Sequence, residues 1–399
     1  MKVLQICNKA FYPERDGGSI AMFAMADGLS KAGAEVDVIC LNIEKLYVNS
    51  GHIPDEIKNR FKLEYVDISV TPSYAGALMT ILQGKNYQLS RFYSAEMEAC
   101  IARRLAGEKY DVAILESLYA SVYLPYIRKH SQARVVLRAH NIEADIWRLL
   151  SKYSTGFFRR MLYSVLSKRL SNYETVIARE VDAVFCLSES DARWFRSVNA
   201  KEVSVVPLSI VLPTEDMQPD EEQKPVFFHL ASMEWLPHQQ AIDWFIKEVW
   251  PLLNNGQGFR KIHLAGRKMP LSFYSYKNEV LEIEGEVNHP KEWMQGKSIM
   301  IVPSFSGGGV LVKSVEGLAM GKVIITTPNG AEGIPYENGV NMFVVNTAAE
   351  FAAVMKRLNE DPALCRQVSE AARLLAKREF DRNMIGLNTR NLLEKLSLE

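Results

Sequence analysis

The segment PSFSGGGVLVKSVEGLAMGK, residues 303–322, contains the residues best suited to bind an anion. An apolar strand pattern leads into Gly307, Gly308 and Gly309, and a helical pattern follows. A helix start offers unpaired N–H groups and a positive dipole end, and glycines let a ligand approach the backbone closely. Lys313 adds a full positive charge in the first turn, where the dipole alone favours negative charge. The combination predicts a phosphate or diphosphate at this loop.

Glu316 lies three residues after Lys313, so the two side chains share one face of the predicted helix. A carboxylate beside a phosphate site is suited to accept hydrogen bonds from sugar hydroxyls, and we expect a ribose here. The alternative is a flexible turn followed by a surface Lys–Glu pair. This loop alone does not separate the two interpretations.

A second glycine loop, PERDGGSIAM at residues 13–22, has the same strand–loop–helix order and places Gly17 and Gly18 at the helix start. A tight turn without a ligand is the common alternative. Neither glycine loop has the spacing of a dinucleotide fingerprint or a P-loop, which argues against an NAD-dependent oxidoreductase. Two glycine–helix junctions in two domains are compatible with one anionic ligand that contacts both.

Two further candidates follow apolar strands. His140 ends the strand pattern 133–140, and Arg267 follows the strand pattern 261–266. Doubly wound sheets bind ligands at the carboxyl ends of their strands, so both side chains are candidates for ligand contacts. A lone histidine is more often structural, but the nearby Glu143 favours a functional interpretation. For Arg267, a solvated surface arginine is an equal alternative.

The sequence offers no metal-binding motif. No two aspartates lie two residues apart, and no His or Cys cluster has zinc-ligand spacing. We therefore expect no metal and no cofactor other than the substrate itself.

Bulk composition limits the class of protein. The 399 residues suggest two or three domains, and 48% hydrophobic with 24% charged residues is ordinary for a globular protein. Lys plus Arg and Asp plus Glu both number 47, and this zero net charge argues against a nucleic-acid-binding protein. Five scattered cysteines and an N-terminus without a long apolar segment lead us to expect a cytoplasmic protein.

The apolar pattern predicts the fold class. Strands are expected at residues 2–8, 35–41, 110–116, 133–140, 182–188 and 202–207, and again at 226–232, 261–266, 281–287, 298–304, 322–327 and 341–345. Most are apolar throughout and alternate with helical patterns, which indicates parallel sheets covered by helices on both faces. An acidic, Pro-rich linker is expected at 213–225. We predict two doubly wound, Rossmann-like α/β domains, residues 1–210 and 211–378, that face each other across a cleft.

An amphipathic helix is predicted at residues 155–170, TGFFRRMLYSVLSKRL. Its apolar stripe contains Phe158, Met161 and Val165, and basic residues lie beside the stripe. Most such helices pack on their own domain, and a minority lie on anionic membranes. This segment is the candidate for peripheral membrane contact.

Together these segments resemble the retaining glycosyltransferases of the GT-B fold, specifically glycosyltransferase family 4, over nearly the whole chain. Residues 303–334 look like the donor-binding stretch of the family and are the most specific part. Residues 232–245, SMEWLPHQQAIDWF, look like the Ser-Met-x-Trp-x-Pro-Asn segment of one subgroup. The DGGS and HNIE segments fit its acceptor-side and sugar-side loops. Val287 lies where family members hold the nucleotide base through main-chain atoms.

The resemblance implies a nucleotide-sugar donor held by the C-terminal domain and a glycan or lipid-linked acceptor held by the N-terminal domain, in surface polysaccharide synthesis. Lys313 would neutralise the diphosphate and Glu316 would hold the ribose. Gly18 would approach the phosphates, and His140 would contact the transferring sugar. A C-terminal helix within residues 379–399 would cross back onto the N-terminal domain.

The sequence departs from the family pattern at several positions. Many members carry a second glutamate where this chain has Gly308. Relatives with three glycines usually have Arg where this chain has Leu311, and another family Arg is replaced by Ser232. The Pro-Asn of the subgroup is Pro237-His238.

The missing arginines leave fewer cations for the diphosphate, so either Arg267 or another cation substitutes or the donor binds weakly. A non-catalytic sugar-nucleotide-binding subunit is therefore one alternative. A nucleotide-sugar epimerase or a phosphorylase of the same fold is another.

Overall fold

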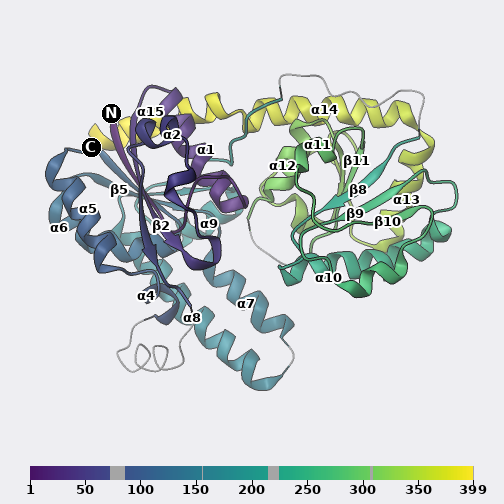
Figure 1. Cartoon of the computed structure of the whole chain (residues 1–399), viewed down its shortest axis with the longest axis horizontal. Helices are drawn as coiled ribbons and strands as arrows, with labels where there is room; N and C mark the ends of the chain where they lie inside the picture. The colour runs from purple at the N-terminus through teal and green to yellow at the C-terminus, as the bar shows by residue number, and fades with distance from the viewer. Residues whose placement is uncertain (72–85, 155, 214–223, 306–308, 399) are drawn as a thin grey trace. The chain divides into compact units, whose positions relative to one another are not determined.

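The computed structural model describes residues 1–399 except 72–85, 155, 214–223, 306–308 and 399. The chain divides into two compact units, of which one comprises Met1–Ser209 with Arg382–Glu399 and the other Ile210–Asp381. Each unit is a parallel sheet flanked by helices (Figure 1). The predicted linker lies almost wholly outside the described residues.

Within the described residues, the first unit has a seven-stranded parallel sheet with the order β3-β2-β1-β4-β5-β6-β7. Its strands are β1 Lys2–Cys7, β2 Glu35–Ile43, β3 Glu64–Ile68, β4 Val112–Glu116, β5 Arg134–Ala139, β6 Ala183–Cys186 and β7 Val203–Val205. The strand order changes direction between β1 and β4, and a sheet of this kind binds ligands at the carboxyl ends next to that point.

Helices cover both faces of this sheet. They are α1 Gly17–Lys31, α2 Asp55–Arg60, α4 Tyr87–Ser90, α5 Ala95–Gly107, α6 Leu124–His130, α7 Glu143–Tyr153, α8 Phe157–Glu180, α9 Glu189–Ser197 and α15 Arg382–Leu398. Two apolar cores result, one on each face of the sheet, with Ile6 in one and Val3 in the other. Burial on both faces explains why the central strands are apolar without alternation.

The second unit repeats this architecture with six strands among its described residues, in the order β10-β9-β8-β11-β12-β13. The strands are β8 Phe227–Leu230, β9 Ile262–Ala265, β10 Leu281–Ile283, β11 Ile299–Val302, β12 Val323–Thr326 and β13 Phe343–Val344. The helices are α10 Leu236–Trp244, α11 Pro290–Trp293, α12 Val312–Ala319, α13 Ala348–Glu360 and α14 Pro362–Phe380. The order changes direction between β8 and β11, so the loops after these strands are expected to form the ligand-binding edge.

All twelve predicted strand segments contain a strand, although β10 ends at Ile283, earlier than the predicted residue 287. The sequence analysis missed β3, EYVDI. This strand lies at the edge of its sheet and buries only Val66, so its sequence lacks the apolar run that identifies the central strands.

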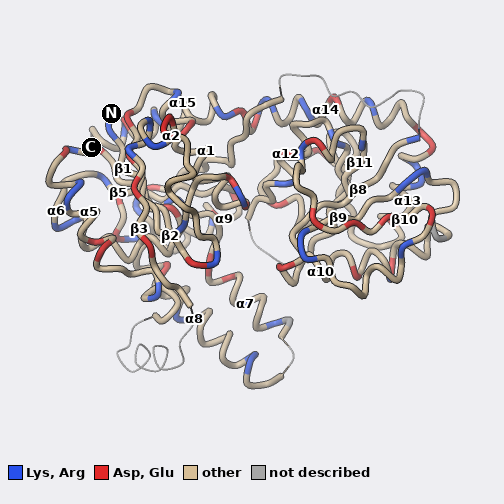
Figure 2. The backbone as a smooth tube through the Cα atoms, in the orientation of Figure 1, with Lys and Arg blue, Asp and Glu red and all other residues tan. Residues whose placement is uncertain are grey.

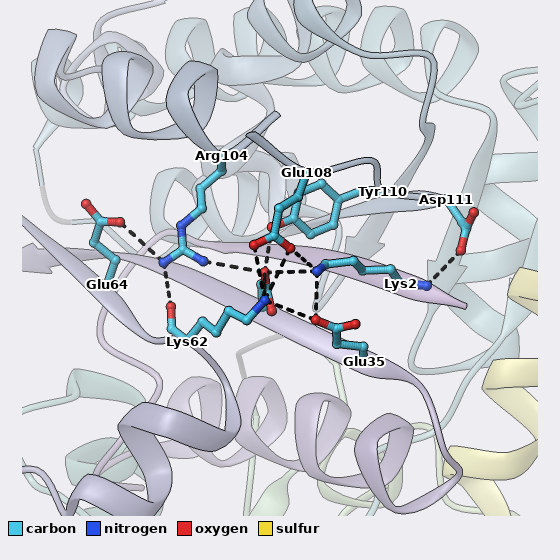
Figure 3. A network of polar contacts seen from close by, with 9 residues as sticks. Lys2, Glu35, Lys62, Glu64, Arg104, Glu108, Tyr110 and Asp111 are labelled. Atoms are coloured by element: carbon cyan, nitrogen blue, oxygen red, sulfur yellow. Dashed lines mark hydrogen bonds and ion pairs between the residues drawn. The ribbon is translucent and has the colours of Figure 1, made fainter. Parts of the chain in front are cut away.

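The amino ends of β1 and β2 are held by an ion-pair network (Figure 3). Lys2 and Lys62 each contact both Glu35 and Glu108. The carboxylate oxygens of Glu35, Asp37 and Glu108 lie within 4.8 Å of one another, an arrangement that can hold a metal ion. Here the ammonium groups of Lys2 and Lys62 already compensate the charge of these carboxylates. The ion-pair network therefore links the strands at the edge of the sheet opposite the expected ligand site.

The C-terminal helix α15 belongs to the first unit and packs closely on α1. Gly28 of α1 and Gly386 of α15 face each other, and a Cβ atom built on Gly386 would lie 2.3 Å from the Gly28 carbonyl oxygen. Arg382 donates to the buried Asp27 carboxylate at 3.2 Å. Glycine at both positions therefore sets the approach of the two helices.

None of the helices in the described part of the chain is both long and apolar enough to cross a membrane.

Candidate functional site

The predicted anion site is the start of α12 in the second unit. Gly309 has φ 75°, a left-handed conformation that glycine adopts without strain. Leu311 precedes the helix and provides no side-chain cap, and the first turn contains no acidic residue. The Ser314 amide donates to the Leu311 carbonyl oxygen, whereas the amides of Val312 and Lys313 have no backbone acceptor among the described residues and could meet a ligand, as an anion site requires. Gly307 and Gly308 lie outside the described residues.

Lys313 is the second residue of α12, and its ammonium has no ion-pair or hydrogen-bond partner among the described residues. The side chain is partly exposed, yet enough protein surrounds the ammonium for burial to lower its pKa to about 7. A half-buried cation without a counter-ion is unfavourable, and a bound anion would remove this penalty. Glu316 follows one turn later on the same helix.

Two histidines lie near Lys313. His229 on β8 is fully buried, its Nδ1 lies 2.8 Å from the Ile301 carbonyl oxygen, and its Nε2 has no partner among the described residues. Burial and the Lys313 charge lower the pKa of His229 well below its usual value and that of His238 to about 4. Both imidazoles are neutral at pH 7, so neither replaces an arginine charge.

The loops after β9 and β10 hold the other predicted residues of this unit. Arg267 donates to Glu234 at 2.8 Å, and its Nε has no partner in the described part of the chain. Arg267, one of the alternatives considered as a substitute for the missing arginines, is therefore already paired with Glu234. The Ser232 hydroxyl is buried and also lacks a described partner. Val287 follows β10, and its main-chain groups make no hydrogen bond to described residues.

In the first unit, His140 follows β5 and contacts the end of β4. Its Nε2 lies 2.6 Å from Glu116 Oε2, and the strand register places Glu116 directly beside Arg138. Burial disfavours ionisation of Glu116, but Arg138 and His140 outweigh it and hold the pKa of this carboxyl below its usual value. Burial likewise lowers the pKa of His140 despite Glu116. A neutral His140 donates from Nε2 to the ionised Glu116 carboxylate.

The second glycine loop is held by Lys9 and Asp16. Asp16 caps α1 by accepting from the Ser19 amide at 2.9 Å, and Lys9 Nζ lies 2.6 Å from its carboxylate. Gly17 and Gly18 form the first residues of α1, and a Cβ built on Gly18 would lie 2.7 Å from Lys9 Nζ. The Lys9 charge also contributes to the lowered pKa of His140. The structure therefore brings the glycine loop and His140 to one end of the sheet.

A pair of buried carboxyl groups, Glu143 and Glu174, meets at the start of α7, three residues after His140 in the sequence. Glu143 begins α7, and burial raises its pKa to about 7. Tyr119 donates its hydroxyl to Glu143 at 3.1 Å, and the Glu143 amide donates to Glu174 Oε1 at 3.0 Å. Burial raises the pKa of Glu174 to about 8. Glu174 of α8 thus caps the start of α7 and fixes Glu143 near the sheet edge.

The sequence analysis did not select Lys9, Glu116, His229 or Glu174 as site residues. Glu116 had a usable signal, since a carboxylate at the end of an apolar strand beside the strand of Arg138 predicts a buried ion pair. Lys9, His229 and Glu174 had none, because their importance comes from neighbours distant in the sequence.

Comparison with known proteins agrees with this architecture. The family model described as Glycosyltransferase Family 4 matches residues 15–214, half of the chain, and that described as Glycosyl transferases group 1 matches residues 224–361. An uncharacterized 44.6 kDa protein in the cps region of Klebsiella pneumoniae is 21% identical over 370 residues, covering 88% of this chain and 89% of that protein.

Solved structures share the fold across both units. HepE of Anabaena, in complex with UDP, matches with a TM-score of 0.66 and 14% identity, covering 99% of this chain and 100% of that one. Sucrose-phosphate synthase of Thermosynechococcus elongatus matches with a TM-score of 0.69 and 14% identity, covering 99% of each chain. Two Rossmann-like units with the GT-B fold, and a family model that spans half of the chain, establish that this protein is a glycosyltransferase that belongs to glycosyltransferase family 4.

Proposed function

We propose that this chain is a retaining glycosyltransferase that transfers a sugar from a nucleoside diphosphate sugar to a glycan or lipid-linked acceptor in surface polysaccharide synthesis. The observation that carries the proposal is the ammonium of Lys313, which lies at an uncapped helix start without a counter-ion among the described residues. A diphosphate would supply the missing negative charge.

The other predicted residues then take defined roles. Glu316 holds the ribose, Val287 contacts the base through its main chain, and the glycines at 307–309 let the diphosphate approach the backbone. Gly17 and Gly18 approach the phosphates, and His140 contacts the transferring sugar. Arg267 joins the site only if the diphosphate displaces Glu234. Because Lys313 and the α12 amides provide the positive charge, the proposal includes no metal ion.

The chemistry follows from where charge develops. Breaking the bond between the sugar and the diphosphate places negative charge on the leaving phosphate. Lys313 and the start of α12 would stabilise that charge more strongly in the transition state than in the bound donor, which is the requirement for catalysis.

Relatives support the donor and the pathway. HepE of Anabaena was solved with UDP and with UDP-glucose, which makes a uridine diphosphate sugar the first donor to test. The Klebsiella relative is described as a protein in the cps region.

The first unit offers a place for the acceptor. A cavity of about 760 Å³ lies beside the middle of α8 and is lined by Tyr93, Tyr126 and Tyr173 together with Arg169. Aromatic walls with a few polar groups suit a sugar ring.

The test is turnover of a donor panel by the wild type and by two variants. We expect Lys313→Ala or Glu316→Ala to lower donor turnover about 10²-fold or more, the scale of losing one key electrostatic group. Free nucleoside diphosphate and a glycoside of unchanged anomeric configuration, identified by NMR, would support retaining transfer. An epimerised nucleotide sugar, or wild-type rates in both variants, would contradict the proposal.

A further inference from the structure

The α7–α8 hairpin projects from the rest of its unit (Figure 1). Exposed apolar side chains gather at the start of α8. Phe157 and Phe158 begin α8, and 75% and 79% of their surfaces are exposed. Met161, Leu162 and Val165 are also exposed and continue the same stripe at helical spacing from Phe158. The described residues of the chain therefore leave this face of α8 uncovered.

The hairpin is also strongly basic. Between Asp145 and Glu174 the sequence contains six Lys or Arg residues and no Asp or Glu, although the whole chain has no net charge. All six basic side chains are exposed, namely Arg148, Lys152, Arg159, Arg160, Lys168 and Arg169. Figure 2 shows Lys and Arg along this hairpin, with acidic residues confined to its base.

We propose that the tip of the α7–α8 hairpin binds the surface of an anionic lipid bilayer. Phenylalanine, methionine and leucine side chains insert into the boundary between headgroups and acyl chains, and the neighbouring cations contact lipid phosphates. The apolar stripe and the cations lie on one helix, so a single orientation uses both.

The positive charge of the hairpin and its apolar stripe together favour an anionic lipid surface over two other binding partners, a second copy of this chain and a nucleic acid. A second copy of this chain would bring six like charges against six, which disfavours pairing through this face. A nucleic acid would use the cations but would leave the aliphatic stripe in water. A lipid surface satisfies both features, and no spanning helix is needed for peripheral binding of this kind.

Flotation with vesicles tests the proposal on the full chain. Vesicles of phosphatidylcholine alone and vesicles containing phosphatidylglycerol separate apolar insertion from electrostatic attraction. We expect the wild type to float with the anionic vesicles, at least ~10-fold more than with the neutral ones, and to be released by high salt.

Two double variants locate the contact. We expect Phe157→Ser with Phe158→Ser, and separately Arg159→Gln with Arg160→Gln, to reduce flotation at least ~10-fold without changing the melting temperature, because all four side chains are exposed. Leu271→Ser, at a residue 86% exposed in the second unit, is the apolar control. Lys356→Gln with Arg357→Gln, an adjacent exposed pair on α13, is the charge control.

The proposal fails if the wild type stays unbound with anionic vesicles, or if the control variants lose flotation as much as the hairpin variants. It also fails if sedimentation shows a dimer that the phenylalanine variants dissociate, since the face would then be a contact between copies. None of these readouts requires turnover, so the outcome does not depend on the proposed transferase activity.

Discussion

At the residue scale, Lys313 is the side chain whose surroundings most clearly favour the binding of an anion. Burial lowers its pKa to about 7, and no acidic partner among the described residues opposes this shift. Both nearby imidazoles are neutral, so Lys313 and the two histidines together carry little positive charge above pH 7. A diphosphate would stabilise the ammonium and raise its pKa again.

The lowered pKa of Lys313 predicts that the protein takes up protons when UDP binds. Because the Lys313 pKa is lowered in the unliganded protein and raised in the complex, UDP binding should take up protons between the two values. At pH 8 we expect uptake of about 0.9 proton if the pKa returns to its ordinary value near 10. Affinity should fall by up to about tenfold per pH unit above pH 7. Calorimetry in buffers of different ionisation enthalpy measures both.

Lys322 provides the matched control for proton uptake. It is another lysine whose pKa burial lowers, here to about 8. It lies just before β12, at the amino end of that strand, and donates to the Lys297 carbonyl oxygen at 2.7 Å. Lys313→Met should abolish proton uptake and Lys322→Met should not. Equal uptake in both variants would show that another group titrates.

The sequence patterns predicted the positions of residues at the ends of strands and helices. They did not predict properties that depend on contacts with residues distant in the sequence. Lys313 and His140 were predictable because a strand pattern, a loop and a helix pattern fix their positions in any doubly wound sheet. Their electrostatic states were not predictable. Burial, with Arg138 and Lys9, lowers the pKa of His140 against the opposing effect of Glu116, and these groups come together only in the folded sheet.

At the element scale, the contact between α1 and α15 depends on two glycines. A Cβ on Gly386 would lie 2.3 Å from the carbonyl oxygen and 2.7 Å from the Cα of Gly28. The clash is with backbone, which cannot rotate away as a flexible side chain does. The resemblance to glycosyltransferase family 4 implied a C-terminal helix within residues 379–399 that returns to the N-terminal domain. Nothing in the sequence identified α1 as the helix it contacts, since glycine spacing alone names no partner.

We predict that Gly386→Ala destabilises the protein by about 1–3 kcal/mol, the usual cost of overpacking a close contact. Gly107→Ala is the control, because Gly107 also lies in a helix, α5, and a Cβ there meets nothing within 4 Å. That variant should be neutral or stabilising by up to about 1 kcal/mol. Chemical denaturation measures both, and a Gly386→Ala protein as stable as the wild type would refute this account of the helix contact.

At the scale of the whole molecule, the two family models fall on the two units, and each unit has its own set of candidate residues. The second unit contains Lys313, which has no partner in the part of the chain that the structure describes, at a helix start without a side-chain cap. The first contains a neutral histidine, a glycine loop and a tyrosine-lined cavity. The apolar patterns predicted this repetition, because both halves need fully buried parallel strands, but they did not distinguish donor from acceptor chemistry.

If the units divide the reaction in this way, binding and transfer should separate in variants. Lys313→Met should weaken UDP binding by about 10–100-fold, because it removes the charge that opposes the diphosphate. His140→Ala should leave the Kd for UDP within about twofold of the wild-type value, because UDP lacks the sugar that His140 is proposed to contact. The same variant should lower kcat by about 10²-fold, because it removes a contact to the transition state. Calorimetry with UDP and turnover with the sugar donor, on the same preparations, supply the two readouts. Loss of UDP affinity in His140→Ala comparable to that in Lys313→Met would mean that the histidine contacts the diphosphate, and the assignment of the first unit to the sugar would then be wrong.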